Sequence, residues 1–276
     1  MAHYETLLYE ERNGVAWVTL NRPKVHNAFN TVMQRELYEL WRSLRRNDDV
    51  RAVVLTGAGD KAFCTGIDRT ETMGGTAEPA DKADDRAVGR ASTPFMFDDP
   101  GANIGPKSCD LWKPVIAAVN GMACGGAFYM LGEVEFIIAA EQATFFDPHV
   151  TYGMTAAFEP MHMLQKMPFN EIMRLSLLGN YERLSARRAC EIGLVSEVVS
   201  ADKLHETATW AAEAIASQPP LAIQGTLRAI WTARELGRSQ ALALGYAFIG
   251  LGTNRESIRA GQEVFASGKR AKWKLR

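Results

Sequence analysis

The sequence of 276 residues predicts an α/β fold followed by an all-helical region. Two segments, 52–68 and 113–132, each combine a buried strand with a glycine-containing turn and the start of a helix. Beyond about residue 202 the pattern changes to consecutive helices, separated by glycine and proline breaks. We therefore expect a core over residues 1–200 and a helical region over residues 201–276.

The composition favours a globular protein and argues against several classes of partner. Hydrophobic residues make up 47% of the chain, which suffices for a sizeable core. The formal net charge of −1 gives no reason to expect a nucleic acid or an anionic membrane as partner. The 4 cysteines show neither metal-ligand spacing nor a disulfide framework, so we expect no metal site and a reducing compartment.

The chain shows no signal for secretion or for membrane insertion. Its start, MAHYETLLYEER, lacks a basic region followed by an apolar one. The longest charge-free apolar run, 241–252, is shorter than the roughly 20 residues that cross a bilayer. We therefore expect a cytoplasmic protein without a membrane partner.

The first elements are a hairpin and an amphipathic helix. Strands are expected at Leu7–Glu11 and Val15–Leu20, because Asn13-Gly14 between them is a strong hairpin signal. The following helix carries one apolar stripe at helical spacing. Thr31 and Gln34 fit a capping box at its start.

The rest of the core is expected to alternate between strands and helices. Segment 69–112 interrupts this order, because its Gly, Pro, Asp, Ala and Thr content shows little periodicity. It predicts a long excursion over the surface, of the kind that covers a site. The remaining strands are expected at 52–56, 115–119, 136–140, 144–146 and 194–199, and helices at 158–167 and 170–178.

The glycine-rich turn after the strand at 115–119 is the most informative feature of the sequence. Gly125-Gly126 allow a tight backbone where a helix begins, so their free amides face outward. Such amides form a site for an anion, either a phosphate or an oxyanion that develops during a reaction. Gly66 occupies a similar turn after the strand at 52–56. Glycine motifs of the usual nucleotide-binding kinds are absent from the sequence.

The chain resembles the crotonase (enoyl-CoA hydratase/isomerase) superfamily over nearly its whole length. The resemblance implies a spiral of ββα turns and a C-terminal helical trimerisation region, hence a homotrimer or a dimer of trimers. It also implies a role in fatty acid metabolism, with a coenzyme A thioester as substrate and no prosthetic group. The motifs that stand in the family's order and spacing are Asn21-Arg-Pro-Lys24, Asn27-Ala28, Lys61-Ala-Phe63, Gly66-Ile-Asp68, Lys113–Gly121, Gly125-Gly126, Ser185-Ala186 and Gly193-Leu-Val195.

The resemblance assigns a role to both glycine turns. By position, the backbone amides of Ile67 and Gly126 polarise the thioester carbonyl and stabilise the enolate that forms from it. The residues that the resemblance assigns to coenzyme A contacts are Lys24, Ala28, Lys61, Ala62 and Lys269. The segment 69–112 is expected to shape the acyl pocket.

The chain departs from the family where hydratases carry two glutamates that hold and activate water. Aligning the glycine turns places Tyr129 and His149 at these two positions. His149 is the candidate for acid–base work, since an imidazole exchanges protons readily near neutral pH. Glu159 is expected either to orient this imidazole or to supply a carboxylate, and Tyr129 either to donate a hydrogen bond or to fill space.

The reaction type stays open at this level. The leading hypothesis is an acyl-CoA enzyme that hydrates or isomerises an enoyl-CoA, although a two-glutamate syn-hydration is in doubt. The first alternative is hydrolytic C–C cleavage of a β-diketone or β-keto substrate by His149 and Glu159. The second is a non-catalytic member that only binds acyl-CoA.

Overall fold

The structure, a computed structural model, divides into two compact units, Met1–Glu213 and Ala214–Arg276. The boundary falls inside helix α8 (Leu204–Ala216). A functional division into a site-bearing core and a trimerising region stays a prediction. The residues that the structure describes are 4–72, 99–268, 270 and 272–275.

The N-terminal hairpin is confirmed. Strands β1 (Leu7–Arg12) and β2 (Val15–Leu20) pair antiparallel. Asn13 and Gly14 join them with φ values of 53° and 76°. A two-residue hairpin turn whose twist matches that of the two strands requires positive φ at both central residues, and Asn and Gly tolerate this conformation best.

The spiral of ββα turns is confirmed by the way in which successive strands enter two sheets. Strands β3, β5 and β7 pair in parallel within a six-stranded sheet of order β1-β2-β3-β5-β7-β10. The strand that follows each of them, β4, β6 or β8, enters a four-stranded sheet of order β4-β6-β8-β9. Their bounds are Ala52–Gly57 for β3, Ala62–Cys64 for β4, Val115–Val119 for β5, Met122–Cys124 for β6, Phe136–Ala140 for β7, Thr144–Phe146 for β8, Leu184–Ser185 for β9 and Glu197–Val199 for β10.

Helix α1 (Thr31–Leu44) has the predicted apolar stripe, but its predicted cap is wrong. Asn30 is the N-cap, because its backbone is extended and its side chain accepts a hydrogen bond from the Met33 amide at 3.0 Å. Thr31 is therefore already helical. The stripe is buried in the same core cluster as the strands, and its members are Met33, Leu37, Leu40, Trp41 and Leu44.

Helix α4 (Ala127–Glu133) is buried along its whole length and packs against α5 (Phe158–Leu164). The two backbones approach closely, since a methyl group added at Gly132 would lie 2.6 Å from Cβ of His162. This packing brings the helix after the second glycine turn next to the helix that carries Glu159. The other helices of this unit are α2 (Arg69–Thr72), α3 (Gly101–Ile104), α6 (Phe169–Leu178) and α7 (Ala186–Glu191).

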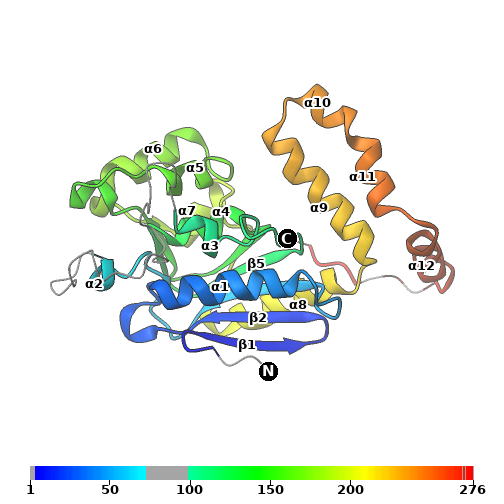
Figure 1. Cartoon of the computed structure of the whole chain (residues 1–276), viewed down its shortest axis with the longest axis horizontal. Helices are drawn as coiled ribbons and strands as arrows, with labels where there is room; N and C mark the ends of the chain where they lie inside the picture. Colours follow the sequence, from blue (N-terminus) through cyan, green and yellow to red (C-terminus); the bar gives the residue numbers. More distant parts are fainter. Residues whose placement is uncertain (1–3, 73–98, 269, 271, 276) are drawn as a thin grey trace, which may run out of the picture. The chain divides into compact units, whose positions relative to one another are not determined.

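The second unit is helical, as the sequence predicts. Helices α9 and α11 lie side by side (Figure 1), and a methyl group at Gly225 would come 2.8 Å from Cα of Gly252. Large apolar side chains are exposed on the helices of this unit, among them Ile230, Leu242, Tyr246, Ile249 and Phe265. A trimer contact would bury such residues, but trimerisation stays a prediction. The bounds are Pro220–Glu235 for α9, Arg238–Ala243 for α10, Gly245–Gly252 for α11 and Arg255–Ala266 for α12.

Among the described residues, no helix has both the length and the apolar character needed to cross a bilayer.

Trp41 provides a test of the core. Its ring is 0% exposed and its Nε1 donates to the carbonyl oxygen of Ile104 at 3.0 Å. We expect Trp41→Phe to lower the free energy of unfolding by about 1–3 kcal/mol, because a buried carbonyl loses its donor. Trp41→Ala should lower it by about 3–5 kcal/mol. Denaturant titration measures both. Trp273→Phe, at a side chain that is 82% exposed, is the control, and equal stability of Trp41→Phe and wild type would contradict the assignment.

Candidate active site

The two glycine turns meet because the strands that lead into them are neighbours. β4 and β6 pair in parallel, so their carboxyl ends lie at the same edge of the sheet. A methyl group added at Gly66 would come 2.9 Å from the nitrogen of Gly126 and 3.2 Å from the carbonyl oxygen of Cys124. The φ values of Gly66 and Gly125 are +85° and +52°. Glycine is therefore required at Gly66 by both its backbone conformation and this close approach.

The amide of Ile67 is directed away from the segment that pairs with its turn. Phe29 donates its amide to the Gly66 carbonyl at 2.9 Å and accepts from the Asp68 amide at 2.8 Å. Since amides alternate in direction along an extended chain, the intervening Ile67 N–H points to the other side. Within the described part of the chain, neither this amide nor that of Gly126 donates a hydrogen bond to the protein.

The turn at Ile67 is anchored by an ion pair. Arg22 donates to Oδ2 of Asp68 at 2.8 Å and to the carbonyl oxygen of Ala28 at 2.7 Å. Burial opposes ionisation of Asp68, but hydrogen bonds from Thr70 and Arg22 keep the pKa of its carboxyl below the ordinary value. The charged Asp68 therefore fixes the backbone on one side of the cavity.

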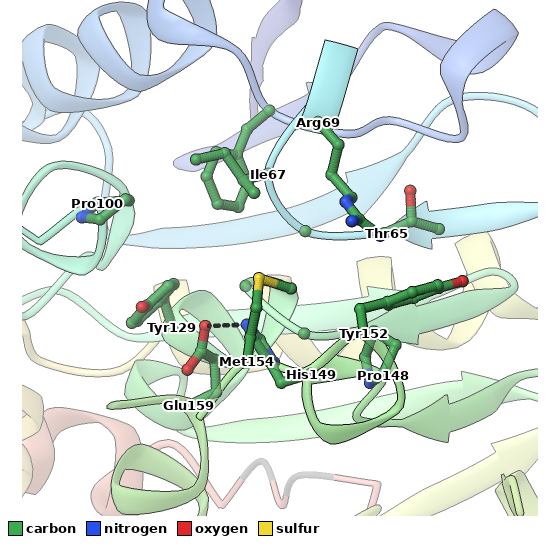
Figure 2. A pocket seen from close by; sticks show the side chains of 14 residues that line it. Thr65, Ile67, Arg69, Pro100, Tyr129, Pro148, His149, Tyr152, Met154 and Glu159 are labelled. Carbon is green, nitrogen blue, oxygen red and sulfur yellow. Dashed lines mark ion pairs between the residues drawn. The ribbon is translucent and has the colours of Figure 1, made fainter. Parts of the chain in front are cut away.

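A cavity of about 230 Å³ lies between the two turns and the 3₁₀ helix His149–Tyr152 (Figure 2). The structure brings together at its walls all five residues that the sequence analysis named as catalytic candidates. These five are Ile67, Gly126, Tyr129, His149 and Glu159. The other lining residues are Phe29, Thr65, Gly66, Arg69, Pro100, Gly125, Pro148, Tyr152 and Met154.

His149 lies between two carboxylates. Its Nδ1 is 2.5 Å from Oδ1 of Asp147, and its Nε2 is 3.3 Å from Oε1 of Glu159 (Figure 2). Cε1 of the ring is 3.5 Å from the point where a Cβ on Gly125 would stand. The imidazole therefore lies directly beside the second glycine turn.

The surroundings of His149 favour its charged form. The hydrogen bond to Asp147 is the main cause that raises the pKa of His149 above the ordinary value, and the Glu159 carboxylate adds to it. Burial and the positive charge of Arg69 act in the opposite direction without cancelling the rise. An imidazole with a raised pKa is a proton donor near neutral pH.

Glu159 and Tyr129 form a second polar wall. Burial raises the pKa of the Glu159 carboxyl, although His149 opposes the rise, and the residue is only 6% exposed. The Tyr129 phenol donates to Oδ2 of Asp99 at 3.0 Å. Burial and the carboxylates of Glu159 and Asp99 raise the pKa of this phenol, so it remains a hydrogen-bond donor.

Four of the five residues assigned to coenzyme A contacts, Lys24, Ala28, Lys61 and Ala62, lie outside the cavity walls. Nδ2 of Asn27 donates to the carbonyl oxygen of Ala62 at 2.8 Å, which ties the loop before it to the start of β4. Within these two segments Lys24 and Lys61 are exposed, whereas Ala28 and Ala62 are buried. Lys269 lies outside the described residues. Coenzyme A contacts stay a prediction for all five.

Sequence reasoning missed part of the site. It did not assign a role in the site to Asp147, Arg69 or Tyr152. The guanidinium of Arg69 lies 4.3 Å from the ring centre of Tyr152. Asp147 and Tyr152 lie close to His149 in the sequence, and this proximity was the signal by which they could have been found.

No group of three or more metal-binding side chains is arranged to hold an ion in the described residues.

Comparison with known proteins gives a consistent result. The family described as "Enoyl-CoA hydratase/isomerase" matches residues 10–276. An (E)-benzylidenesuccinyl-CoA hydratase of Thauera aromatica is 32% identical over 93% of this chain and 94% of its own. A short-chain-enoyl-CoA hydratase of Clostridium acetobutylicum is 32% identical over 86% of this chain and 85% of its own. The crystal structure of an enoyl-CoA hydratase/isomerase from Mycobacterium paratuberculosis matches with a TM-score of 0.83, 33% identity and 99% coverage of both chains.

The raised pKa of Glu159 predicts a pH-dependent stability effect. The pKa of the Glu159 carboxyl is higher in the folded than in the unfolded state. The free energy of unfolding therefore falls as the pH rises from the unfolded-state pKa to the folded-state pKa of this group. His149 acts in the same direction, because its pKa is also raised and its favourable charge is lost as pH rises. Glu159→Gln removes the buried charge. We expect the variant to gain about 1–3 kcal/mol over wild type at pH 9.

Unfolding in denaturant between pH 5 and pH 9 measures this difference. The advantage of Glu159→Gln should shrink toward pH 5. Glu141→Gln, at an exposed residue, removes the same charge and serves as the control. A constant difference across the pH range would contradict a raised pKa at Glu159.

Proposed function

Since the chain belongs to the enoyl-CoA hydratase/isomerase family, we propose that it adds water reversibly to an α,β-unsaturated acyl-CoA, using His149 and Glu159 in place of two glutamates. The observation that carries this proposal is the contact of 3.3 Å between Nε2 of His149 and Oε1 of Glu159 on the cavity wall. It joins a proton donor and a carboxylate beside two free backbone amides. The named hydratases among the relatives support this reaction class.

The amides of Ile67 and Gly126 are assigned to the thioester oxygen. When water attacks the β-carbon, the electron pair of the double bond moves to form an enolate, whose oxygen gains negative charge. Fixed amide donors stabilise that charge more in the transition state than in the ground state. One such donor contributes about 2.7–4 kcal/mol in a well-studied protease.

The proton steps fall to the pair of side chains. Glu159 accepts a proton from water while the water oxygen bonds to the β-carbon. His149 donates the proton on Nε2 to the α-carbon, which collapses the enolate to the saturated thioester. The proton held by Glu159 then returns to His149 across the contact of 3.3 Å, so the sum is one water added and both groups restored.

Tyr129 is assigned a supporting role at the same wall. Its phenol donates to Asp99, which holds the ring beside Glu159, the carboxylate that receives the proton from water. The residues of the coenzyme A contact, Lys24, Ala28, Lys61, Ala62 and Lys269, are proposed to hold the substrate outside the cavity.

A second candidate reaction is hydrolytic C–C cleavage of a β-diketone or β-keto substrate. The same contact favours it, because a histidine and a carboxylate that activate water can direct it to a carbonyl carbon as well as to a double bond. Lyase, isomerase and hydrolase activities are therefore separate outcomes of one assay.

For the assembly and location of the protein, a homotrimer or dimer of trimers in the cytoplasm remains our expectation.

The decisive experiment compares substrates and one variant. Purified protein is assayed with short and medium 2-enoyl-CoAs and with 3-oxoacyl-CoAs and β-diketones. We expect turnover of enoyl-CoA, lowered about 10²-fold or more in His149→Ala, since a lost acid–base group costs this much. His205→Ala, at an exposed histidine of α8, is the control. Cleavage of the keto substrates alone would favour the second candidate, and acyl-CoA binding without any turnover would make the chain a non-catalytic member.

Gly66→Ala tests the amide pair. The added methyl group would come 2.9 Å from the Gly126 nitrogen and cover that donor. We expect kcat to fall about 10²–10³-fold, as when one oxyanion donor is removed. Gly193→Ala is the matched control, because Gly193 has the same φ of +85° but nothing within 4 Å of an added methyl group. Equal activity of the two variants would exclude Gly126 as a donor.

A further inference from the structure

Asp147 is a buried carboxylate to which the proposed reaction assigns no step. We propose that Asp147 is a positioning residue, which holds the Nδ1 proton of His149 and so makes Nε2 the only ring atom that exchanges a proton in the cavity. This inference rests on the proposed function, since it concerns how the same histidine is prepared.

The geometry gives Asp147 two contacts with one residue. Its Oδ1 accepts from the backbone amide of His149 at 3.1 Å and lies 2.5 Å from Nδ1 of the ring. Only Pro148 separates the two residues, and its fixed φ limits the conformations of this link. The same oxygen therefore fixes both the backbone and the ring plane of His149.

Burial makes this contact the main compensation for the charge of Asp147. Its side chain is 1% exposed, and Oδ2 is buried without a hydrogen-bond partner in the described part of the chain. A buried carboxylate costs free energy unless it is paired. Burial is the main cause that raises the pKa of the Cys124 thiol on β6, and the charge of Asp147 adds to the rise, whereas the positive charge of Arg183 opposes it. This thiol therefore stays neutral and supplies no charge that compensates Asp147.

The other charged and titratable groups near His149 make no contact with Nδ1 among the described residues. Glu159 from α5 contacts Nε2 directly, while Arg69 from α2 acts on the ring through its positive charge. Tyr129 from α4 lies beyond Glu159. Asp147 is therefore the one group among the described residues whose contact is with Nδ1.

The consequence is a fixed assignment of the two ring nitrogens. In a neutral imidazole the hydrogen bond made by one nitrogen decides which nitrogen carries the proton. A carboxylate at Nδ1 keeps the proton there, so Nε2 alternates between donor and acceptor toward Glu159 and the substrate. Without Asp147, part of the neutral population would carry its proton on Nε2 and leave Nδ1 without one, and the ring would be free to turn.

Nitrogen-15 NMR of the histidine-labelled protein tests this without substrate, with His149→Gln used to assign the signals. We expect Nδ1 of His149 to keep its proton when Nε2 loses its own, and Asp147→Asn to lower the pH midpoint of this titration. Glu141→Gln, which removes an exposed carboxylate, should leave the midpoint unchanged. A wild-type ring that carries its neutral-state proton on Nε2 would overturn the proposal, even if Asp147→Asn failed to fold.

Kinetics with enoyl-CoA give the second readout. We expect Asp147→Asn to lower kcat about 10- to 100-fold with little change in KM, which is the size of effect found when the carboxylate that orients a metal-bound histidine is changed. The high-pH limb of the kcat profile should move to lower pH, because the charge that stabilises the imidazolium is gone. An unchanged pH profile would overturn the role of Asp147. Absence of turnover in the wild type would instead contradict the proposed function, and the NMR result would still stand.

Discussion

The contact between the Gly66 and Gly126 backbones is the constraint on which the candidate site depends. Two strands that pair in parallel deliver these turns to one edge of a sheet, and the absence of side chains lets the turns touch. A Cβ at Gly66 would enter the space beside the Gly126 nitrogen. The cavity, its two free amides and the position of the histidine beside the turn all follow from this approach.

Charge is the second constraint on the site. His149 gains its raised pKa from two carboxylates, and one of them, Glu159, is itself held at a raised pKa by burial. Such an arrangement costs stability at high pH, because both groups favour their protonated forms in the folded state. Perturbed pKa values of this kind are typical of sites of acid–base chemistry. The predicted departure from the two-glutamate pattern therefore goes with a different pair of groups, His149 and Glu159, and Glu159 lies ten positions after His149 in the chain.

Much of the fold could be predicted, because local patterns determine it. The hairpin follows from Asn13-Gly14, and the parallel strands from short apolar runs that are buried on both faces. The helix cap at Asn30 was predicted one residue late, since a capping pattern read from side-chain types does not report which residue has the extended backbone. The short strand β6 was not predicted, because its three residues between Gly121 and Gly125 are too few to show an alternating apolar pattern.

The sequence by itself determined the family and the two glycine turns, because these depend on residue types at fixed spacing along the chain. That His149 stands where hydratases carry a glutamate stays a prediction from the same spacing. Only the tertiary structure decided that Glu159 faces Nε2 and Asp147 faces Nδ1 of the same ring. The physical reason is that α4 and α5 pack closely at Gly132, which brings a carboxylate from a later helix to the cavity wall. Contacts between residues on different elements depend on how those elements pack, and this packing cannot be predicted from the spacing of residues along a single sequence.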